Sequence, residues 1–211
     1  MAKLFIASDF HVGYGLSHYD KILAFLKIVK VEADKLLLVG DTFDLWCSSI
    51  EEIREREPFR TVYYELLDIA KSVPTTIIRG NHDFSLKADD VLGLDFKEAY
   101  STEEQGVHYQ HDGLILYATH GFEFDPRAKK YAPMFARCFC RLTPTYFKSQ
   151  VYRGYTIRAK TIHAMARARI KLKHLSFLVQ GHTHYPLLEK NFVDCGDFID
   201  HDSYVFWDYP K

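Results

Sequence analysis

Cysteine and long apolar runs are scarce in this sequence of 211 residues. The four cysteines, at positions 47, 138, 140 and 195, do not form the pattern of a disulfide framework. The longest fully apolar runs, such as 36–39, fall far short of the roughly 18 residues needed to span a bilayer. The apolar run at 4–7 is too short for the core of a signal peptide. We therefore expect a reduced, cytoplasmic protein.

Glycine and proline, at 11 and 7 residues, are too few for a collagen-like or disordered chain. Hydrophobic residues make up 47% of the sequence and aromatic residues 15%. A chain of this length and composition suits one α/β domain, which can bury roughly 70% of its unfolded surface. We therefore expect residues 1–211 to form a single domain.

Acidic residues are absent between Pro126 and Leu188, although this stretch holds 13 Lys and Arg residues. The remainder of the chain holds 14 basic and 28 acidic residues, so the net charge of −1 conceals two blocks of opposite sign. This asymmetry predicts two faces with opposite electrostatic fields.

The first hundred residues alternate between short apolar runs and segments with helical spacing of apolar residues. This alternation predicts βαβ units around a largely parallel sheet. Strands are expected at 3–7, 36–39 and 75–78, with helices at 19–29 and from Glu57-Pro58 onward. Beyond residue 105, a hairpin is expected around Asp112-Gly113, and short strands are expected at 177–179, 191–195 and 204–207.

Two apolar stripes at helical spacing predict helices within the basic stretch. The second helix is expected to begin at Thr143-Pro144, with Thr as its N-cap and Pro as its first residue. The basic stretch is thus predicted to be a helical insertion, at about 126–174, between strands of one domain. The first stripe consists of Met134, Phe135, Cys138, Phe139 and Leu142, and the second of Ile157, Thr161, Ala164, Met165, Ala168 and Leu172.

Five loops that each follow a strand-like run carry Asp, His or Asn side chains. Such loops converge at one end of a sheet, so residues far apart in the sequence can meet there. The donors are carboxylate, imidazole and amide groups without a thiolate, which suits Mn²⁺, Fe or Zn²⁺ in five- or six-coordinate sites. The loops are Ser8–His11, Gly40–Asp44, Gly80–Asp83, Thr119–Gly121 and Gly181–His184.

The donors are sufficient in number for two metal ions. Two cations roughly 3.5–4 Å apart can share a hydroxide and clamp the oxygens of a phosphoryl group during in-line attack. Each loop alone is common by chance, but all five in this order, each after a strand, favour a binuclear site. The predicted ligands are Asp9, His11 and His184 for the first ion, Asn81, His120 and His182 for the second, and Asp41 as the bridge.

His82 holds no metal in this scheme. We predict that it donates to a phosphate oxygen or to the leaving group, with Asp83 or Asp44 orienting an imidazole. The glycines that precede Asp41, Asn81 and His182 are predicted to allow tight turns and close backbone approach.

The residues of these loops and their order closely resemble the calcineurin-like metallophosphoesterase family, whose motifs read D-x-H, G-D-x-x-D, G-N-H-[DE], H and G-H-x-H. The resemblance runs from Asp9 to His184. It implies a four-layer αββα sandwich, in which helices flank two sheets, and two divalent metal ions, with Mn²⁺ expected first. It also implies the same seven ligands, and His82 as the catalytic histidine with Asp83 beside it.

Within this family, the motifs look most like the branch of UDP-2,3-diacylglucosamine pyrophosphatases. The resemblance lies in 40–46 (Gly-Asp-Thr-Phe-Asp-Leu-Trp), 81–84 (Asn-His-Asp-Phe), 181–186 (Gly-His-Thr-His-Tyr-Pro) and 195–197 (Cys-Gly-Asp). Enzymes of that branch also insert a basic helical lid at this place, although they typically have Arg where this sequence has His82. The phosphoprotein phosphatase branch is disfavoured, because its G-D-x-H-G and D-R-G motifs are not present here.

The resemblance predicts a dimetal phosphoesterase that hydrolyses a phosphoanhydride or phosphodiester bond in a UDP-diacylglucosamine-like or other nucleotide-linked small molecule. A general phosphodiesterase or nuclease would use the same centre on nucleic acid, which we rank lower as a partner. A phosphoesterase fold retained only as a protein-binding scaffold ranks last, because such proteins lose ligands and this sequence keeps all seven.

The basic insertion has four interpretations, one of which is a surface that binds nucleic acid. Its cations can close over a polyanionic substrate, with Arg137, Arg141 and Lys148 predicted as substrate-binding residues. They can instead contact anionic lipid headgroups as a peripheral membrane surface, or simply form the solvated face of the insertion's own core. For a lipid-bearing substrate, the side chains expected to accept acyl chains are Phe135, Phe139, Phe147 and Met165.

Overall fold

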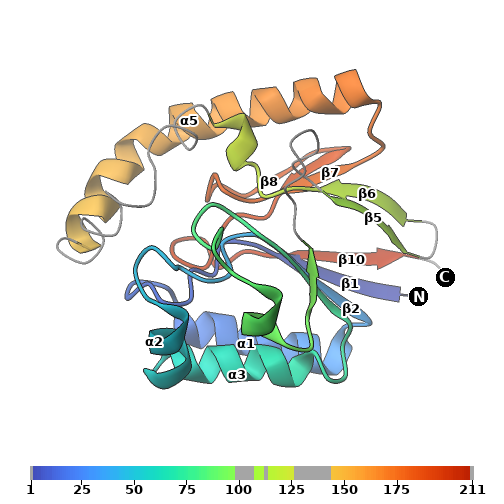
Figure 1. The fold of residues 1–211 in the computed structure, drawn as a ribbon. Coiled ribbons are helices and arrows are strands. Elements are labelled where there is room, and N and C mark those ends of the chain that lie inside the picture. Colours follow the sequence, from blue (N-terminus) through green and yellow to red (C-terminus); the bar gives the residue numbers. More distant parts are fainter. Residues whose placement is uncertain (1, 98–106, 112–113, 126–143, 210–211) are drawn as a thin grey trace.

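Two five-stranded sheets form the centre of the computed structural model, which describes residues 2–97, 107–111, 114–125 and 144–209 (Figure 1). The first sheet has the strand order β10-β1-β2-β3-β4, with β1 to β4 parallel and β10 antiparallel to β1. Its strands are β1 (Ala2–Ala7), β2 (Lys35–Val39), β3 (Thr75–Ile78), β4 (Asp95–Lys97) and β10 (Val205–Tyr209).

The second sheet has the strand order β5-β6-β7-β9-β8. Its three central strands run parallel, and the two edge strands are antiparallel to their neighbours. The predicted hairpin is present, because β5 and β6 pair with His111 opposite Leu114. The strands are β5 (Val107–His111), β6 (Leu114–Ala118), β7 (Leu178–Gln180), β8 (Leu187–Leu188) and β9 (Phe192–Asp194).

Helices cover the outer face of each sheet, so the molecule has four layers (Figure 1). Helices α1 (Tyr19–Glu32), α2 (Ile50–Glu55) and α3 (Phe59–Ile69) lie on the first sheet, and α5 (Pro144–Lys173) lies on the second. Two short 3₁₀ helices, η1 (Ala88–Val91) and η2 (Phe122–Phe124), lie in the connections. The four-layer αββα arrangement implied by the family resemblance is therefore confirmed.

Alternation along the strands explains the layers. In β1, Phe5 and Ala7 pack with the helices on one side, whereas Leu4 and Ile6 pack against the second sheet. The outer face of the second sheet, which includes Tyr117 and Leu178, packs against α5. Because successive residues of these strands are buried on opposite faces, each sheet has to be covered on both sides. Each sheet covers one face of the other, and helices cover the remaining face.

Helix α2 and strands β4 and β8 were not predicted from the sequence. The sequence does carry the signature that starts α2: the Ser49 side chain accepts the N–H of Glu52, and the Glu52 side chain accepts the N–H of Ser49. Strands β4 and β8 are only three and two residues long, so they have too little periodicity to detect.

Helix α5 begins at Pro144, as predicted, but the predicted apolar stripe does not pack on the sheet. Ile157 and Leu172 are 76% and 77% exposed, and the other members of that stripe are also exposed. The face that packs on the second sheet is made by Ala159, Ile162, Ala166 and Ile170. The helix carries two apolar stripes on opposite sides, and spacing alone cannot decide which of them is buried.

The first predicted stripe of the insertion, including Phe135 and Phe139, lies outside the described residues, as does the side chain of Phe147. The extent of the insertion and the single-domain organisation therefore stay predictions, although α5 ends at Lys173, close to the expected limit. Among the described residues, Cys47 and Cys195 do not take part in a disulfide, and no helix has the length and apolarity to cross a membrane.

Candidate metal centre

Five strands end immediately before the five motif loops. The last residues of β1, β2, β3, β6 and β7 are Ala7, Val39, Ile78, Ala118 and Gln180, and each is followed by its loop within one or two residues. Backbone hydrogen bonds join loops that are distant in sequence, such as Asp9 N–H to the Gly40 carbonyl at 3.1 Å. The predicted convergence of the loops at one edge is confirmed.

The converging loops place six of the seven predicted ligands in two groups. Within each group, one potential ligand atom from each residue lies within 4.8 Å of the others. The first group is Asp9, His11 and His184, and the second is Asp41, His120 and His182. The first group contains the three residues predicted for the first ion, and the second contains His120, His182 and the predicted bridge Asp41.

Asp41 lies between the groups. Its Oδ2 atom is 3.1 Å from Nε2 of His120 and 3.7 Å from Nε2 of His11, so one carboxylate oxygen faces both groups. Its Oδ1 atom accepts the backbone N–H of His82 at 2.7 Å, which fixes the orientation of the carboxylate. This is the geometry expected of a bridging ligand.

Buried polar atoms without hydrogen-bond partners gather at the same place. In the described part of the chain they include Asp9 Oδ1, His11 Nε2, Asn81 Oδ1 and His120 Nε2, one atom from each of four predicted ligands. A buried polar atom left unsatisfied costs about 1–3 kcal/mol, so natural structures rarely keep several together without a partner. Divalent ions bound by these atoms would satisfy them, and the residues therefore fit the expected cofactor.

Each histidine of the two groups has its other ring nitrogen held by an oxygen. The partner is a carboxylate in three cases and a carbonyl in the fourth. Such contacts fix the tautomer and the orientation of a metal-ligating imidazole. The pairs are His11 Nδ1 with Asp44 at 3.0 Å, His120 Nδ1 with the Val39 carbonyl at 3.0 Å, His182 Nε2 with Asp125 at 3.2 Å, and His184 Nδ1 with Asp197 at 2.7 Å.

The loop backbone is strained at the candidate ligands. The φ angles of Asp9, His11, Asp41, His182 and His184 are 55°, 49°, 49°, 69° and 57°, in the left-handed region that L-residues seldom adopt. Strained residues of this kind cost of the order of 1–3 kcal/mol each and cluster at functional sites. The strain thus coincides with the residues selected by their chemistry.

The predicted close approach at glycine is also confirmed. A Cβ atom at Gly80 would overlap the carboxylate of Asp41, and one at Gly181 would overlap the side chains of Ser8 and Asp9. A Cβ atom at Gly40 would overlap the ring of His120. Any side chain at these positions would displace a candidate ligand.

The electrostatics of the centre favour a cation. Burial alone would lower the pKa of His11, but the hydrogen bond with Asp44 and the nearby carboxylates of Asp9 and Asp41 raise it to about 10. In the same way, Asp41 and Asp9 outweigh burial and raise the pKa of His120 to about 9. Carboxylates that draw protons onto buried imidazoles attract a divalent cation for the same reason.

The environment of His182 is different. Burial lowers its pKa to about 4, although the hydrogen bond with Asp125 acts in the opposite direction. The imidazole is therefore neutral at physiological pH, which is the protonation state that binds a metal ion. Because Nε2 is held by Asp125, Nδ1 is the nitrogen left for an ion.

His82 lies beside the first group and is not part of it. Its ring centroid is 4.6 Å from that of His11, and its ring stacks on Trp46 with centroids 3.8 Å apart. Asp44 Oδ2 is 3.1 Å from Nδ1 of His82, which leaves Nε2 to meet a substrate oxygen. Asp44 thus holds both His82 and His11, and this shared contact accounts for the further cluster that these three residues form.

Asp83 has different contacts from those predicted for an orienting residue. Its buried carboxylate accepts backbone N–H groups of Thr42 at 2.8 Å and of Gly80. Burial and the nearby Asp41 raise its pKa to about 6. Of the two alternatives, Asp44 is the residue that contacts imidazoles, whereas Asp83 fastens the loop after β2 to the loop after β3.

Arg137 and Arg141, predicted to bind substrate, lie outside the described residues, as does the side chain of Lys148 in α5. A different cation from the basic stretch reaches the centre. Arg158 of α5 binds the carboxylate of Asp125, and its guanidinium lies 3.4 Å from Nε2 of His182. Neither Arg158 nor Asp125 was identified from the sequence, since neither belongs to a motif; Asp125 is marked only as the last acidic residue before the basic stretch.

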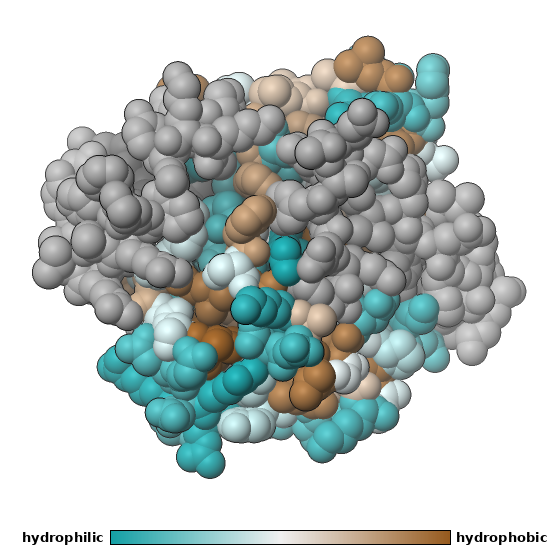
Figure 2. Space-filling view, viewed as in Figure 1, coloured by the Kyte–Doolittle hydropathy of each residue, from teal (hydrophilic) through white to brown (hydrophobic). Residues whose placement is uncertain are grey.

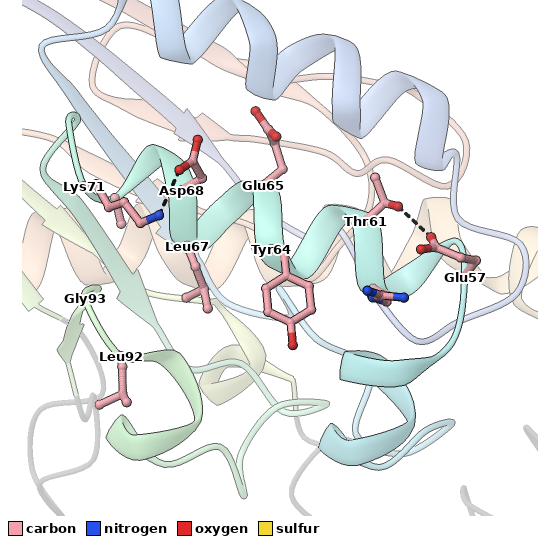
Figure 3. A pocket seen from close by; sticks show the side chains of 11 residues that line it. Glu57, Thr61, Tyr64, Glu65, Leu67, Asp68, Lys71, Leu92 and Gly93 are labelled. Carbon is pink, nitrogen blue, oxygen red and sulfur yellow. Dashed lines mark hydrogen bonds and ion pairs between the residues drawn. The ribbon is translucent and has the colours of Figure 1, made fainter.

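A separate pocket of about 810 Å³ lies along the outer side of α3 (Figure 3). Tyr64 and Leu67 project into it from the helix, and Leu92 faces them from the following connection. Lys71 pairs with Asp68 at its rim. Of the residues described as lining it, none is a predicted ligand or substrate-binding residue, so it is distinct from the candidate centre.

A binuclear donor set at the carboxyl ends of the strands, within an αββα sandwich, defines a class of metal-dependent phosphoesterases. Residues 2–186 match the family described as calcineurin-like phosphoesterase. The match covers most of the chain, and the protein belongs to this family.

Relatives with established names agree with this class. A UDP-2,3-diacylglucosamine hydrolase of Bordetella pertussis is 28% identical over 206 residues, covering 87% of this chain and 77% of the relative. A protein of the same name from Histophilus somni is 31% identical over 86 residues, which is 40% of this chain and 36%, about a third, of that protein. Family membership and these names support a hydrolase of phosphate esters or anhydrides.

Among solved structures, Yfce, a phosphoesterase from E. coli, has a TM-score of 0.50 and 19% identity. The match covers 98% of this chain and 88% of Yfce. At this identity the likeness concerns the fold alone.

Proposed function

We propose that this protein is a dinuclear metal-dependent hydrolase that cleaves a phosphoanhydride or phosphodiester bond in a nucleotide-linked, lipid-bearing substrate of the UDP-diacylglucosamine type. The observation that carries the proposal is the pair of ligand groups with one oxygen of Asp41 facing both. The named relatives support the choice of substrate.

In this proposal the first ion is held by Asp9, His11 and His184, and the second by Asn81, His120 and His182, with Asp41 between them. Mn²⁺ is the expected ion, with Fe and Zn²⁺ as alternatives, because the donors are oxygen and imidazole nitrogen. When bound, the ions supply an activated water and neutralise charge on the phosphoryl group.

His82 has the catalytic role assigned from the sequence. Its Nδ1 is held by Asp44, so Nε2 is oriented to donate to a phosphate oxygen or to the departing group. Stacking on Trp46 restricts the plane of the ring. A histidine held in this way transfers a proton at a fixed position, which general acid catalysis requires.

Helix α5 is the part of the protein that favours a lipid-bearing substrate and peripheral contact with a membrane surface. Its outer stripe exposes Ile157, Met165 and Leu172, and Lys160 and Lys171 are exposed beside it. Hydrophobic residues are visible at the upper edge of the molecule, over the C-terminal half of α5 (Figure 2). Apolar side chains flanked by lysines are typical of helices that lie on anionic lipid surfaces. The proposed location is the cytoplasm, with contact to such a surface.

The test is Mn²⁺-dependent hydrolysis of a substrate panel by the wild-type protein and by Asp41→Ala, which is expected to be inactive throughout. The panel contains UDP-2,3-diacylglucosamine, the same nucleotide sugar without acyl chains, a small aryl phosphodiester and single-stranded DNA. Preference for the acylated nucleotide supports the proposal. Equal rates with and without acyl chains refute the lipid-bearing substrate, and turnover of DNA or the aryl diester alone refutes the nucleotide-linked one.

A further inference from the structure

Asp125 connects a candidate metal ligand to helix α5. Its carboxylate is almost fully buried, and Oδ2 lies 3.2 Å from Nε2 of His182. The same oxygen accepts a hydrogen bond from Nε of Arg158 at 2.6 Å and a second from Nη2 of the same guanidinium. Arg158, Asp125 and His182 therefore form a continuous chain from the fourth layer to the second ligand group.

The carboxylates that support the histidines of the first group are held differently. Asp44 accepts backbone N–H groups of Trp46 and Cys47, and Asp197 accepts those of Asp200 and His201, each within its own loop. The Asp125 carboxylate is instead bound by side chains of other elements, and its cationic partner is on α5. Its position thus depends on how the helix is seated.

A second buried contact joins α5 to the loop Gly181–His184, which contains His182. His163 Nε2 lies 2.9 Å from Oδ2 of Asp194, and that oxygen also accepts the hydroxyl of Thr183 at 2.8 Å. Thr183 stands between His182 and His184 in the sequence. Helix α5 is therefore linked to the loop Gly181–His184 at two points, through Asp125 and through Asp194, in addition to its apolar packing on the sheet.

We propose that Asp125 and Arg158 are positioning residues for the second metal ion, so that α5 forms part of the metal centre as well as a cover over the sheet. The inference rests on the ligand assignment proposed above. Arg158 fixes Asp125, and Asp125 holds Nε2 of His182, which leaves Nδ1 of that ring for the ion. Outer-shell contacts of this kind typically change metal affinity about 10–100-fold when they are removed.

The chain offers a matched control on the same helix. Arg167 binds Glu189 through two hydrogen bonds of 2.9 and 2.6 Å, so it is another arginine–carboxylate pair, between α5 and the residue that follows β8. Glu189 contacts no candidate ligand among the described hydrogen bonds. Arg167→Gln therefore removes an α5 anchor of the same kind without touching the centre.

The experiment titrates Mn²⁺ into metal-free protein, with free Mn²⁺ followed by electron paramagnetic resonance, for wild type, Asp125→Asn, Arg158→Gln, Arg158→Lys and Arg167→Gln. Asp125→Asn is expected to keep one site and to weaken the other about 10–100-fold. Both Arg158 variants should weaken the same site by less, with Arg158→Lys closer to wild type. Arg167→Gln should bind both ions as the wild type does.

Unchanged affinity of both sites in Asp125→Asn would overturn the inference. An equal loss in Arg167→Gln and Arg158→Gln would also overturn it, because general loosening of α5 would then explain the effect. Asp41→Ala separates this failure from failure of the underlying assignment: if that variant binds two ions normally, the ligand set is wrong, whatever Asp125 does. Circular dichroism of each metal-free variant verifies folding, and the conservative Arg158→Lys keeps the test available if another variant does not fold.

Discussion

Metal binding at two separate groups should appear as two additive increments of thermal stability. In the assignment proposed above the two ions share Asp41 but otherwise use different residues, so each ion should stabilise the folded chain largely independently of the other. At a free concentration one hundred times its dissociation constant, an ion that binds only the folded state stabilises it by about 2.7 kcal/mol. Two ions then contribute about 5 kcal/mol, which for a chain of this size raises the melting temperature by about 10–20 °C.

The assay is circular dichroism melting of EDTA-treated protein with and without Mn²⁺. His184→Ala and His120→Ala each remove one ligand from one group, so each should retain about half of the wild-type increase. Asp41→Ala should lose most of it. His18→Ala is the matched control, because His18 also pairs with an aspartate, Asp202, but belongs to neither group.

Two results would refute the reasoning. A full increase in Asp41→Ala would mean that this carboxylate does not serve both groups. An increase abolished by His184→Ala and by His120→Ala alike would mean that the groups do not bind ions separately.

Three further predictions concern His82 and α5. His82→Ala should reduce the turnover number roughly 10²–10⁴-fold with two Mn²⁺ ions still bound, measured by steady-state kinetics beside metal analysis; loss of an ion would make His82 a ligand instead. Ile162→Ala should lower the free energy of unfolding by about 2–5 kcal/mol, whereas Leu172→Ala should change it by less than about 0.5 kcal/mol in urea melts, because Ile162 is buried and Leu172 is exposed. The pair Met165→Glu and Leu172→Glu should together abolish flotation with vesicles containing phosphatidylglycerol without shifting the melting temperature; flotation equal to that of the wild type would argue against the outer stripe of α5 as the lipid-binding surface.

The position of the centre could be predicted from the sequence because each motif begins where a strand ends. A run such as Leu36 to Val39 predicts a buried strand, and parallel strands bring their carboxyl ends to one edge. The chemistry of the loops then sufficed to divide the ligands into two groups. The structure confirms the convergence of the loops and the close glycine contacts, and it gathers six of the predicted ligands in two groups.

The contacts behind the ligands could be predicted only in part. Asp44 and Asp83 are equally plausible partners of an imidazole in the sequence, and the backbone N–H groups that donate to Asp83 are identified only in the folded structure. The role of Asp125 depends on where α5 is seated. That seating was itself mispredicted, because both stripes of the helix combine two alanines with larger apolar residues, so their composition and spacing do not distinguish the buried stripe from the exposed one.

The left-handed backbone at five candidate ligands makes alanine an ambiguous probe of this centre. An alanine placed there keeps a conformation that costs an L-residue about 1–2 kcal/mol and loses the polar contacts that hold the loop in place. Glycine removes the same ligand and adopts positive φ freely. For Asp41, the difference in the free energy of unfolding between the glycine and alanine variants would measure the cost of the left-handed backbone. The loss of metal binding that the two variants share would measure the contribution of the carboxylate ligand.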